Sequence, residues 1–122
     1  MKPIGFWFAH LHQALESSLD RILAVEALTR RHWQVLNTID GGDRVDEALS
    51  PFGEHQETVT DLRARGWIDD RDGLTPTGRE AHARIKTEVG KFRARVTEGI
   101  GDDDYRTTVG VLERMAANLA RE

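Results

Sequence analysis

Apolar residues near the start of the chain recur at steps of three and four, which is the spacing of one face of a long helix. This stripe consists of Ile4, Phe8, Leu11, Leu15, Leu19 and Ile22. Phe6, Trp7, His10 and Ala14 lie partly off the stripe, so the predicted helix has a second apolar face. A second apolar face indicates contact with a partner subunit as well as with the chain's own core.

Three shorter helices are predicted in the middle of the chain. Thr29 is a suitable N-cap for the segment RRHWQVLNTI, whose inward-facing residues are predicted to be Trp33, Leu36 and either Ile39 or Val35. The sequence DGG at 40–42 ends that helix, because glycine tolerates the positive φ of a helix stop. RVDEAL then predicts two helical turns, and EHQETVTDLRARG predicts a third helix with Val59 and Leu62 inward.

The segment WIDDRDGLT predicts two short strands around a tight turn at Asp72-Gly73. Thr75 and Pro76 suit the N-cap and first turn of the next helix. That helix has the most regular apolar pattern in the chain: Ala81, Ile85, Val89, Phe92, Val96 and Ile100. A last helix follows, with an apolar side made of Val109, Leu112, Met115 and Leu119.

These elements predict a mainly α fold with one small β-hairpin, and at 122 residues the chain is long enough for a single domain with a modest core. The absence of cysteine excludes disulfides and thiolate metal sites. No apolar run approaches the roughly 18 residues of a membrane span, and the first residues do not form a signal peptide. We therefore expect a soluble protein of the reducing cytoplasm, without membrane contact.

The distribution of charge is uneven. The net charge of −4 does not indicate a strongly basic nucleic-acid-binding protein, although an acidic protein can still present a basic contact face. Residues 41–73 contain nine acidic and four basic residues, for a formal charge of −5, which leaves about +1 for the rest of the chain. The segment 41–73 is called the acidic lobe below.

Histidine and the other chemically active residues do not form a recognisable site. His10 and His12 are two positions apart, so a helix points them in different directions, and His32, His55 and His82 are scattered. The sequence contains no paired-carboxylate, nucleophile-base or glycine-rich phosphate motif. We therefore expect no metal site, no cofactor and no enzymatic activity.

The segments RRHWQVL, LRARGWI and LTPTGREAHARI, in this order and spacing, resemble the signature segments of the MarR-type winged helix-turn-helix transcriptional regulators. The resemblance covers nearly the whole chain, from about Gly5 to the last helix. It implies a homodimer in which residues 1–28 and 79–122 form the dimerisation helices. Residues 29–78 would form the winged helix-turn-helix lobe that binds double-stranded DNA.

The resemblance also implies which residues contact DNA. The helix from about Glu54 to Arg65 would be the recognition helix, with its exposed N-terminal half in the major groove. The implied base-contacting residues are Glu54, His55, Gln56, Thr58 and Thr60. The implied backbone contacts are Arg63, Arg65 and Arg71, with Arg30, Arg31 and Arg44 as further candidates. The alternative role of each arginine is to solvate a helix face and pair with a nearby acid.

This chain differs from the family in its charge. Its wing is short and acidic, and Glu54, Glu57 and Asp61 stand where relatives usually carry basic or neutral residues. An acidic residue beside a phosphate repels it, because phosphate contacts need a cation or a neutral donor. A second hypothesis is therefore a winged-helix dimer with weakened or lost DNA binding, whose acidic lobe binds a basic surface on another protein.

The resemblance further implies a small aromatic or phenolic effector, held between the dimerisation helices and the winged lobe. The candidate lining residues combine aromatic walls with a few polar groups: Trp7, His10, His12, Phe6 and Trp33. The alternative is that Trp7 and Trp33 belong to the core or to the dimer interface.

Overall fold

The computed structural model describes residues 1–121 of a chain that divides into two units, Met1–Gly90 and Lys91–Glu122. The first unit contains α1 (Ile4–Ala24), α2 (Arg30–Asp40), α3 (Val45–Leu49), the 3₁₀ turn η1 (Ser50–Phe52), α4 (Gln56–Ala64) and most of α5 (Pro76–Val96). The second unit contains the end of α5 and α6 (Asp102–Ala120). The prediction of a mainly α fold is confirmed.

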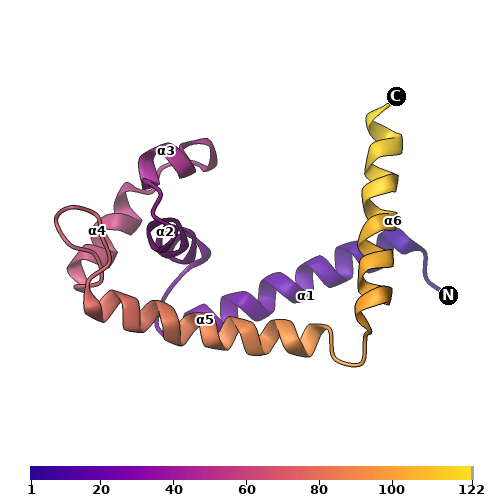
Figure 1. Ribbon diagram of the computed structural model, residues 1–122, viewed down its shortest axis with the longest axis horizontal. Helices are drawn as coiled ribbons and strands as arrows, with labels where there is room; N and C mark the ends of the chain where they lie inside the picture. The colour runs from indigo at the N-terminus through magenta and orange to yellow at the C-terminus, as the bar shows by residue number, and fades with distance from the viewer. Residues whose placement is uncertain (122) are drawn as a thin grey trace. The chain divides into compact units, whose positions relative to one another are not determined.

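A single cluster of buried apolar side chains holds the first unit together. Its fully covered members are Leu23 of α1, Val35 and Leu36 of α2, and Leu62 of α4. α2 contacts α1, α3 and α4, and Figure 1 shows α2, α3 and α4 gathered near the start of α5. The inward positions predicted for α2 and α4 are therefore correct at Leu36 and Leu62. α2 is the helix against which α1, α3 and α4 pack.

The helix α4 is shorter than the predicted recognition helix. It begins at Gln56 with His55 as its N-cap, so Glu54 lies outside the helix. Gly53 has a φ of 105°, which no helical residue adopts and which separates η1 from α4. At the other end Gly66, with a φ of 79°, turns the chain out of the helix.

The predicted pair of strands is not present among the described residues, and a single antiparallel bridge between Ile68 and Leu74 stands in their place. The flanking residues are already used by the helices on either side. Gly66 ends the turn after α4, while Thr75 bonds to both Gly66 and Gly78 as it starts α5. The bridge therefore has no room to extend, and the wing is a turn rather than a β-hairpin.

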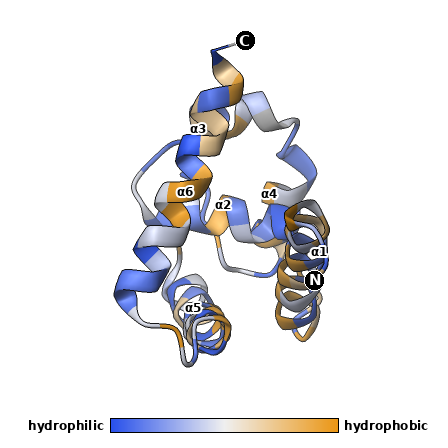
Figure 2. Cartoon of the chain, turned by 90° about the vertical axis from the view of Figure 1, so that its right-hand side faces the viewer, coloured by the Kyte–Doolittle hydropathy of each residue, from blue (hydrophilic) through white to orange (hydrophobic). Residues whose placement is uncertain are grey.

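α1 and α6 each carry several exposed apolar residues. The N-terminal half of α1 exposes Ile4, Phe6, Trp7, Phe8 and Leu11. In α6 no residue is buried, and its exposed apolar residues include Val111, Leu112, Met115 and Leu119. Figure 2 shows hydrophobic positions recurring along both helices. No helix within the described part of the chain is long and apolar enough to cross a membrane.

Candidate functional site

The first unit contains a groove of about 1000 Å³, formed by the end of α2, the start of α3, the start of α4 and the turn after α4. Six residues predicted to contact DNA line this groove: Arg44, Glu54, His55, Gln56, Arg63 and Arg71. They come from three separate stretches of sequence. The groove is therefore where the fold brings the start of α4 together with the wing turn.

The three arginines in the groove differ in their contacts. The side chain of Arg63 forms an ion pair with Asp72, and its Nε lies 3.5 Å from the carbonyl oxygen of Asp69. The exposed side chains of Arg44 and Arg71 form no hydrogen bond or ion pair with another described residue. Two cations in the groove are therefore available to an external anion.

The groove as a whole is slightly acidic. Its carboxylates are Asp43, Asp46, Glu54 and Asp72. Four carboxylates against three arginines give a formal charge of −1, with histidine counted as neutral. A phosphate group is therefore attracted only locally, near an arginine, and not by the groove as a whole.

Two of the predicted base-contacting residues are buried in this structure. Thr58 is only 8% exposed, because it lies one turn before Leu62 and shares its inward face. His55, the N-cap residue of α4, is 7% exposed. Its Nε2 atom has no hydrogen-bond partner among the described residues. Thr58 thus has little exposed surface, whereas His55 lines the groove through the small part of it that is exposed.

The other predicted base-contacting residues remain on the surface. Glu54 and Gln56 are exposed and line the groove, whereas Thr60 is exposed but does not line it. An amide such as that of Gln56 can pair with the donor and acceptor of adenine, while a carboxylate can only accept. Gln56 is thus the residue at the start of α4 best suited to a base edge.

Two of the further arginine candidates are bonded within the first unit. Arg30 pairs with two carboxylates of α1, at 2.6 Å from Glu16 and 3.1 Å from Asp20. Arg31 donates from its guanidinium to the carbonyl oxygen of Glu54. Both arginines therefore have the alternative role of binding neighbouring groups, and neither lines the groove.

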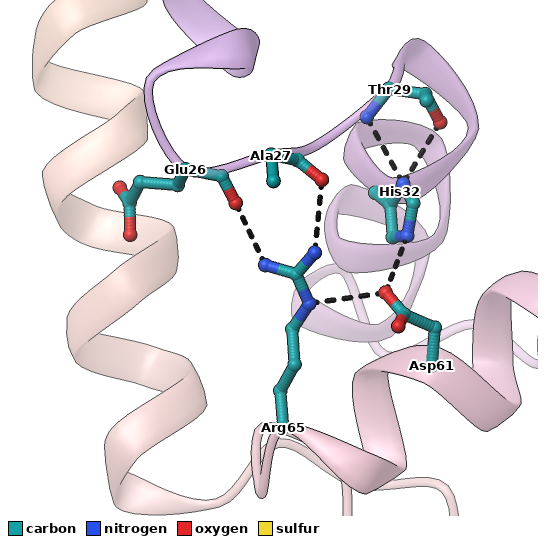
Figure 3. A network of polar contacts seen from close by, with 6 residues as sticks. All are labelled: Glu26, Ala27, Thr29, His32, Asp61 and Arg65. Carbon is teal, nitrogen blue, oxygen red and sulfur yellow. Dashed lines mark hydrogen bonds and ion pairs between the residues drawn. The ribbon is translucent and has the colours of Figure 1, made fainter.

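Arg65 is the centre of a polar network behind α4 (Figure 3). Its guanidinium donates to the carbonyl oxygens of Glu26 and Ala27, at 2.8 and 2.9 Å. Its Nε donates to the carboxylate of Asp61 at 3.0 Å. These three hydrogen bonds are all to groups of the chain itself, so Arg65 connects α4 to the end of α1.

His32 extends this network to the start of α2. The backbone N–H of Thr29 lies 3.0 Å from its Nδ1, and Nε2 lies 2.8 Å from the Asp61 carboxylate. Because a backbone N–H can only donate, Nδ1 accepts and the Nε2–H donates to Asp61. The bond from His32, together with Arg65, holds the pKa of Asp61 below its usual value. Asp61 is therefore an internal partner, and not a free acid facing DNA.

The acidic wing turn is also organised from within. The carboxylate of Asp69 accepts hydrogen bonds from the backbone N–H groups of Gly73 and Arg71, both at 2.9 Å. These bonds lower the pKa of Asp69, with the bond from Gly73 as the largest cause. Within the turn, Asp72 adopts a positive φ of 61°. The turn therefore has a fixed shape that sets the position of Asp72.

The predicted effector residues are not brought together. Phe6 stacks on His10 at 5.4 Å and meets Trp7 edge-on at 5.1 Å, all near the start of α1. His12 instead lies 3.5 Å from Glu16 of the same helix. Trp33 stacks on the His82 ring of α5, with 5.1 Å between the ring centroids. The five residues thus form three separate groups.

Sequence reasoning missed Asp72 as the partner of Arg63 and Asp61 as the link between helices. The spacing of four between Asp61 and Arg65 is a helical pairing signal that predicts part of the network. No local signal links Asp61 to His32, which lies 29 positions earlier. Among the described residues no group of three or more histidine or acidic side chains is arranged to hold a metal ion.

No protein-family model matches this chain, and no curated protein matches it in sequence. Solved structures do match. A MarR-family transcriptional regulator from Rhodococcus sp. RHA1 is 22% identical with a TM-score of 0.69, covering 93% of this chain and 91% of that one. The oxidised form of MarR from E. coli is 18% identical with a TM-score of 0.65, covering 95% and 96%.

A third structure is CouR from Rhodococcus jostii RHA1 bound to p-coumaroyl-CoA, which is 21% identical with a TM-score of 0.71 and covers 94% of this chain and 92% of that one. These matches extend over both units of the chain. At such low identity they establish the fold alone. The chain has the fold of the MarR-family transcriptional regulators.

Proposed function

We propose that this protein is a DNA-binding transcriptional regulator of the MarR type. The observation that carries the proposal is the groove beside α4, where the unpaired arginines Arg44 and Arg71 share one surface with Gln56. In the proposal the two arginines hold backbone phosphates while Gln56 reaches a base edge. The internal contacts of Asp61 and Asp69 support the proposal, because both carboxylates accept hydrogen bonds from groups of the chain itself and Asp61 also forms an ion pair with Arg65.

We further propose that the protein acts as a homodimer, with residues 1–28 and 79–122 as its dimerisation helices. The exposed apolar faces of α1 and α6 support this, because a monomer rarely leaves so many large apolar side chains in water. A dimer would present two copies of α4 to a pseudo-palindromic site.

Fluorescence anisotropy with the duplex upstream of the protein's own gene, in about 50 mM salt, tests the proposed DNA binding. We expect saturable binding that Arg71→Ala and Arg44→Ala each weaken roughly threefold to tenfold, with the salt dependence reduced by about one phosphate contact. Arg21→Ala is the charge-matched control, because Arg21 lies on α1 and bonds to Ser18. Absence of binding to this duplex and to genomic fragments would favour the acidic lobe as a surface for a basic protein.

Control by a small aromatic effector is also part of the proposal, supported by the aromatic cluster of Phe6, Trp7 and His10 and by the ligand of CouR. We expect salicylate or a related phenol to quench tryptophan fluorescence saturably. The quenching should disappear in Trp7→Phe and persist in Trp33→Phe, because Trp33 stacks on His82 instead. If the quenching is lost in Trp33→Phe alone, the effector site is near α2. If the fluorescence of the unmodified protein shows no saturable change, the protein has no such effector.

A further inference from the structure

Arg63 and Asp72 both line the groove beside α4, and they are bonded to each other. Arg63 is on the last turn of α4, and Asp72 is on the wing turn that follows. Their side chains are 40% and 61% exposed, so the pair is at the surface where a phosphate would approach. The carboxylate thus occupies a bonding position on the cation that a DNA backbone would use.

We infer that Asp72 is an intramolecular competitor for DNA, which occupies Arg63 until a phosphate displaces it. The inference rests on the proposed DNA-binding function. Carboxylate and phosphate oxygens both accept from a guanidinium in the same planar geometry, so one can replace the other without moving the helix.

The position of Asp72 is set by the turn and not by chance contact. The Asp69 carboxylate holds the N–H groups of Arg71 and Gly73, on either side of Asp72. The backbone N–H of Asp72 itself donates to the carbonyl oxygen of Asp69 at 3.1 Å. With its backbone fixed on both sides, Asp72 keeps its carboxylate near Arg63 in the absence of DNA.

The strength of the pair suits a competitor. Ion pairs between exposed side chains contribute little, because water and salt screen them, and measured couplings correspond to at most about fivefold in an equilibrium constant. DNA can therefore open the pair, but with a reduced affinity. The freed carboxylate also takes up a cation, so fewer counterions are released overall and the salt dependence becomes shallower.

The test measures DNA affinity by fluorescence anisotropy, over a KCl series, for the full-length protein and for Asp72→Asn. Asparagine tolerates the positive φ at this position, so the turn is preserved. We expect Asp72→Asn to bind about threefold to fivefold more tightly, with a salt slope steeper by about one. The matched control is Asp70→Asn, which removes the same charge from the same turn. Asp70 forms no ion pair with a described residue and does not line the groove. Its effect should be less than about twofold.

A second comparison isolates Arg63. In an Arg63→Ala background, adding Asp72→Asn should change the affinity no more than adding Asp70→Asn does. Equal effects of the two asparagine substitutions in the original protein would overturn the inference, as would a gain from Asp72→Asn that survives without Arg63. If the unmodified protein and every variant fail to bind DNA, both the proposed function and this inference are wrong. If the unmodified protein binds and only the predicted difference is missing, the inference alone is wrong.

Discussion

Replacing Gly78 with alanine is expected to lower the free energy of unfolding by about 3–5 kcal/mol, a large fraction of the total stability of a small domain. Gly78 is buried in the first turn of α5, and an added Cβ would lie 2.1 Å from the carbonyl oxygen of Trp67. That carbonyl cannot move aside freely, because it accepts the N–H of Thr75 at 3.0 Å. Relieving the clash therefore requires α5 to separate from the turn after α4.

Urea unfolding followed by circular dichroism measures this loss. Gly90→Ala is the matched control in the same helix, because nothing lies within 4 Å of its added Cβ. Alanine has a higher helix propensity than glycine, so this control should be stabilised by about 0.5–1 kcal/mol. A Gly78→Ala protein within about 1 kcal/mol of the original would mean that the contact between α5 and Trp67 is not rigid.

The start of α5 separates what the sequence can predict from what it cannot. Thr75 and Pro76 are predicted as cap and first turn from their residue types, and the structure confirms both, with the N–H of Gly78 bonded to the Thr75 hydroxyl at 3.0 Å. The requirement for glycine at 78 is different in kind. It arises from a carbonyl eleven positions earlier, and no periodicity within the helix carries that information.

The buried face of α4 could also be predicted from the sequence. The predicted inward position of Leu62 is correct, and the same periodicity applied one turn earlier places Thr58 inward as well. The resemblance to MarR proteins instead assigned Thr58 and His55 to the DNA face. The local pattern was the better guide here, because burial within one helix follows from its own spacing, while a functional assignment depends on where the helix begins.

The formal charge of the acidic lobe follows from the sequence, but the contacts that its carboxylates make do not. Asp61, Asp69 and Asp72 each accept a hydrogen bond or ion pair within the lobe. The contacts of Asp61 with Arg65 and of Asp69 with Arg71 are local in sequence, within four positions. The pair of Asp72 with Arg63, nine positions apart, and the bond from His32 to Asp61 are not local. A charge count alone therefore overstates the number of acids without a partner, because several of these carboxylates contact groups of the chain itself.

The second large effect is expected at Arg65, whose replacement by alanine should lower the free energy of unfolding by about 2–3 kcal/mol. The side chain is only 26% exposed and donates three hydrogen bonds, two of them to carbonyl oxygens of the turn between α1 and α2. Ala27 in that turn has a φ of 58°, a conformation that costs an alanine about 1–2 kcal/mol and needs support. Loss of Arg65 leaves the two carbonyls and the Asp61 carboxylate with fewer donors, and bonds to charged groups contribute about 1.5–3 kcal/mol.

Arg71→Ala is the matched control, because it removes an exposed guanidinium that forms no side-chain hydrogen bond with a described residue, and it should change stability by less than about 0.5 kcal/mol. Acid unfolding provides a second readout. The pKa of Asp61 is lowered in the folded protein, so its contribution is present above the unfolded value of about 4 and is lost as the pH falls through the lowered folded value. Asp61→Asn should therefore make the fall in stability below about pH 4 shallower, leaving the part due to Asp69.

Arg65→Ala with unchanged stability but weakened DNA binding would contradict the predicted role of Arg65, since it would make Arg65 a phosphate contact and not the link between α4 and the end of α1.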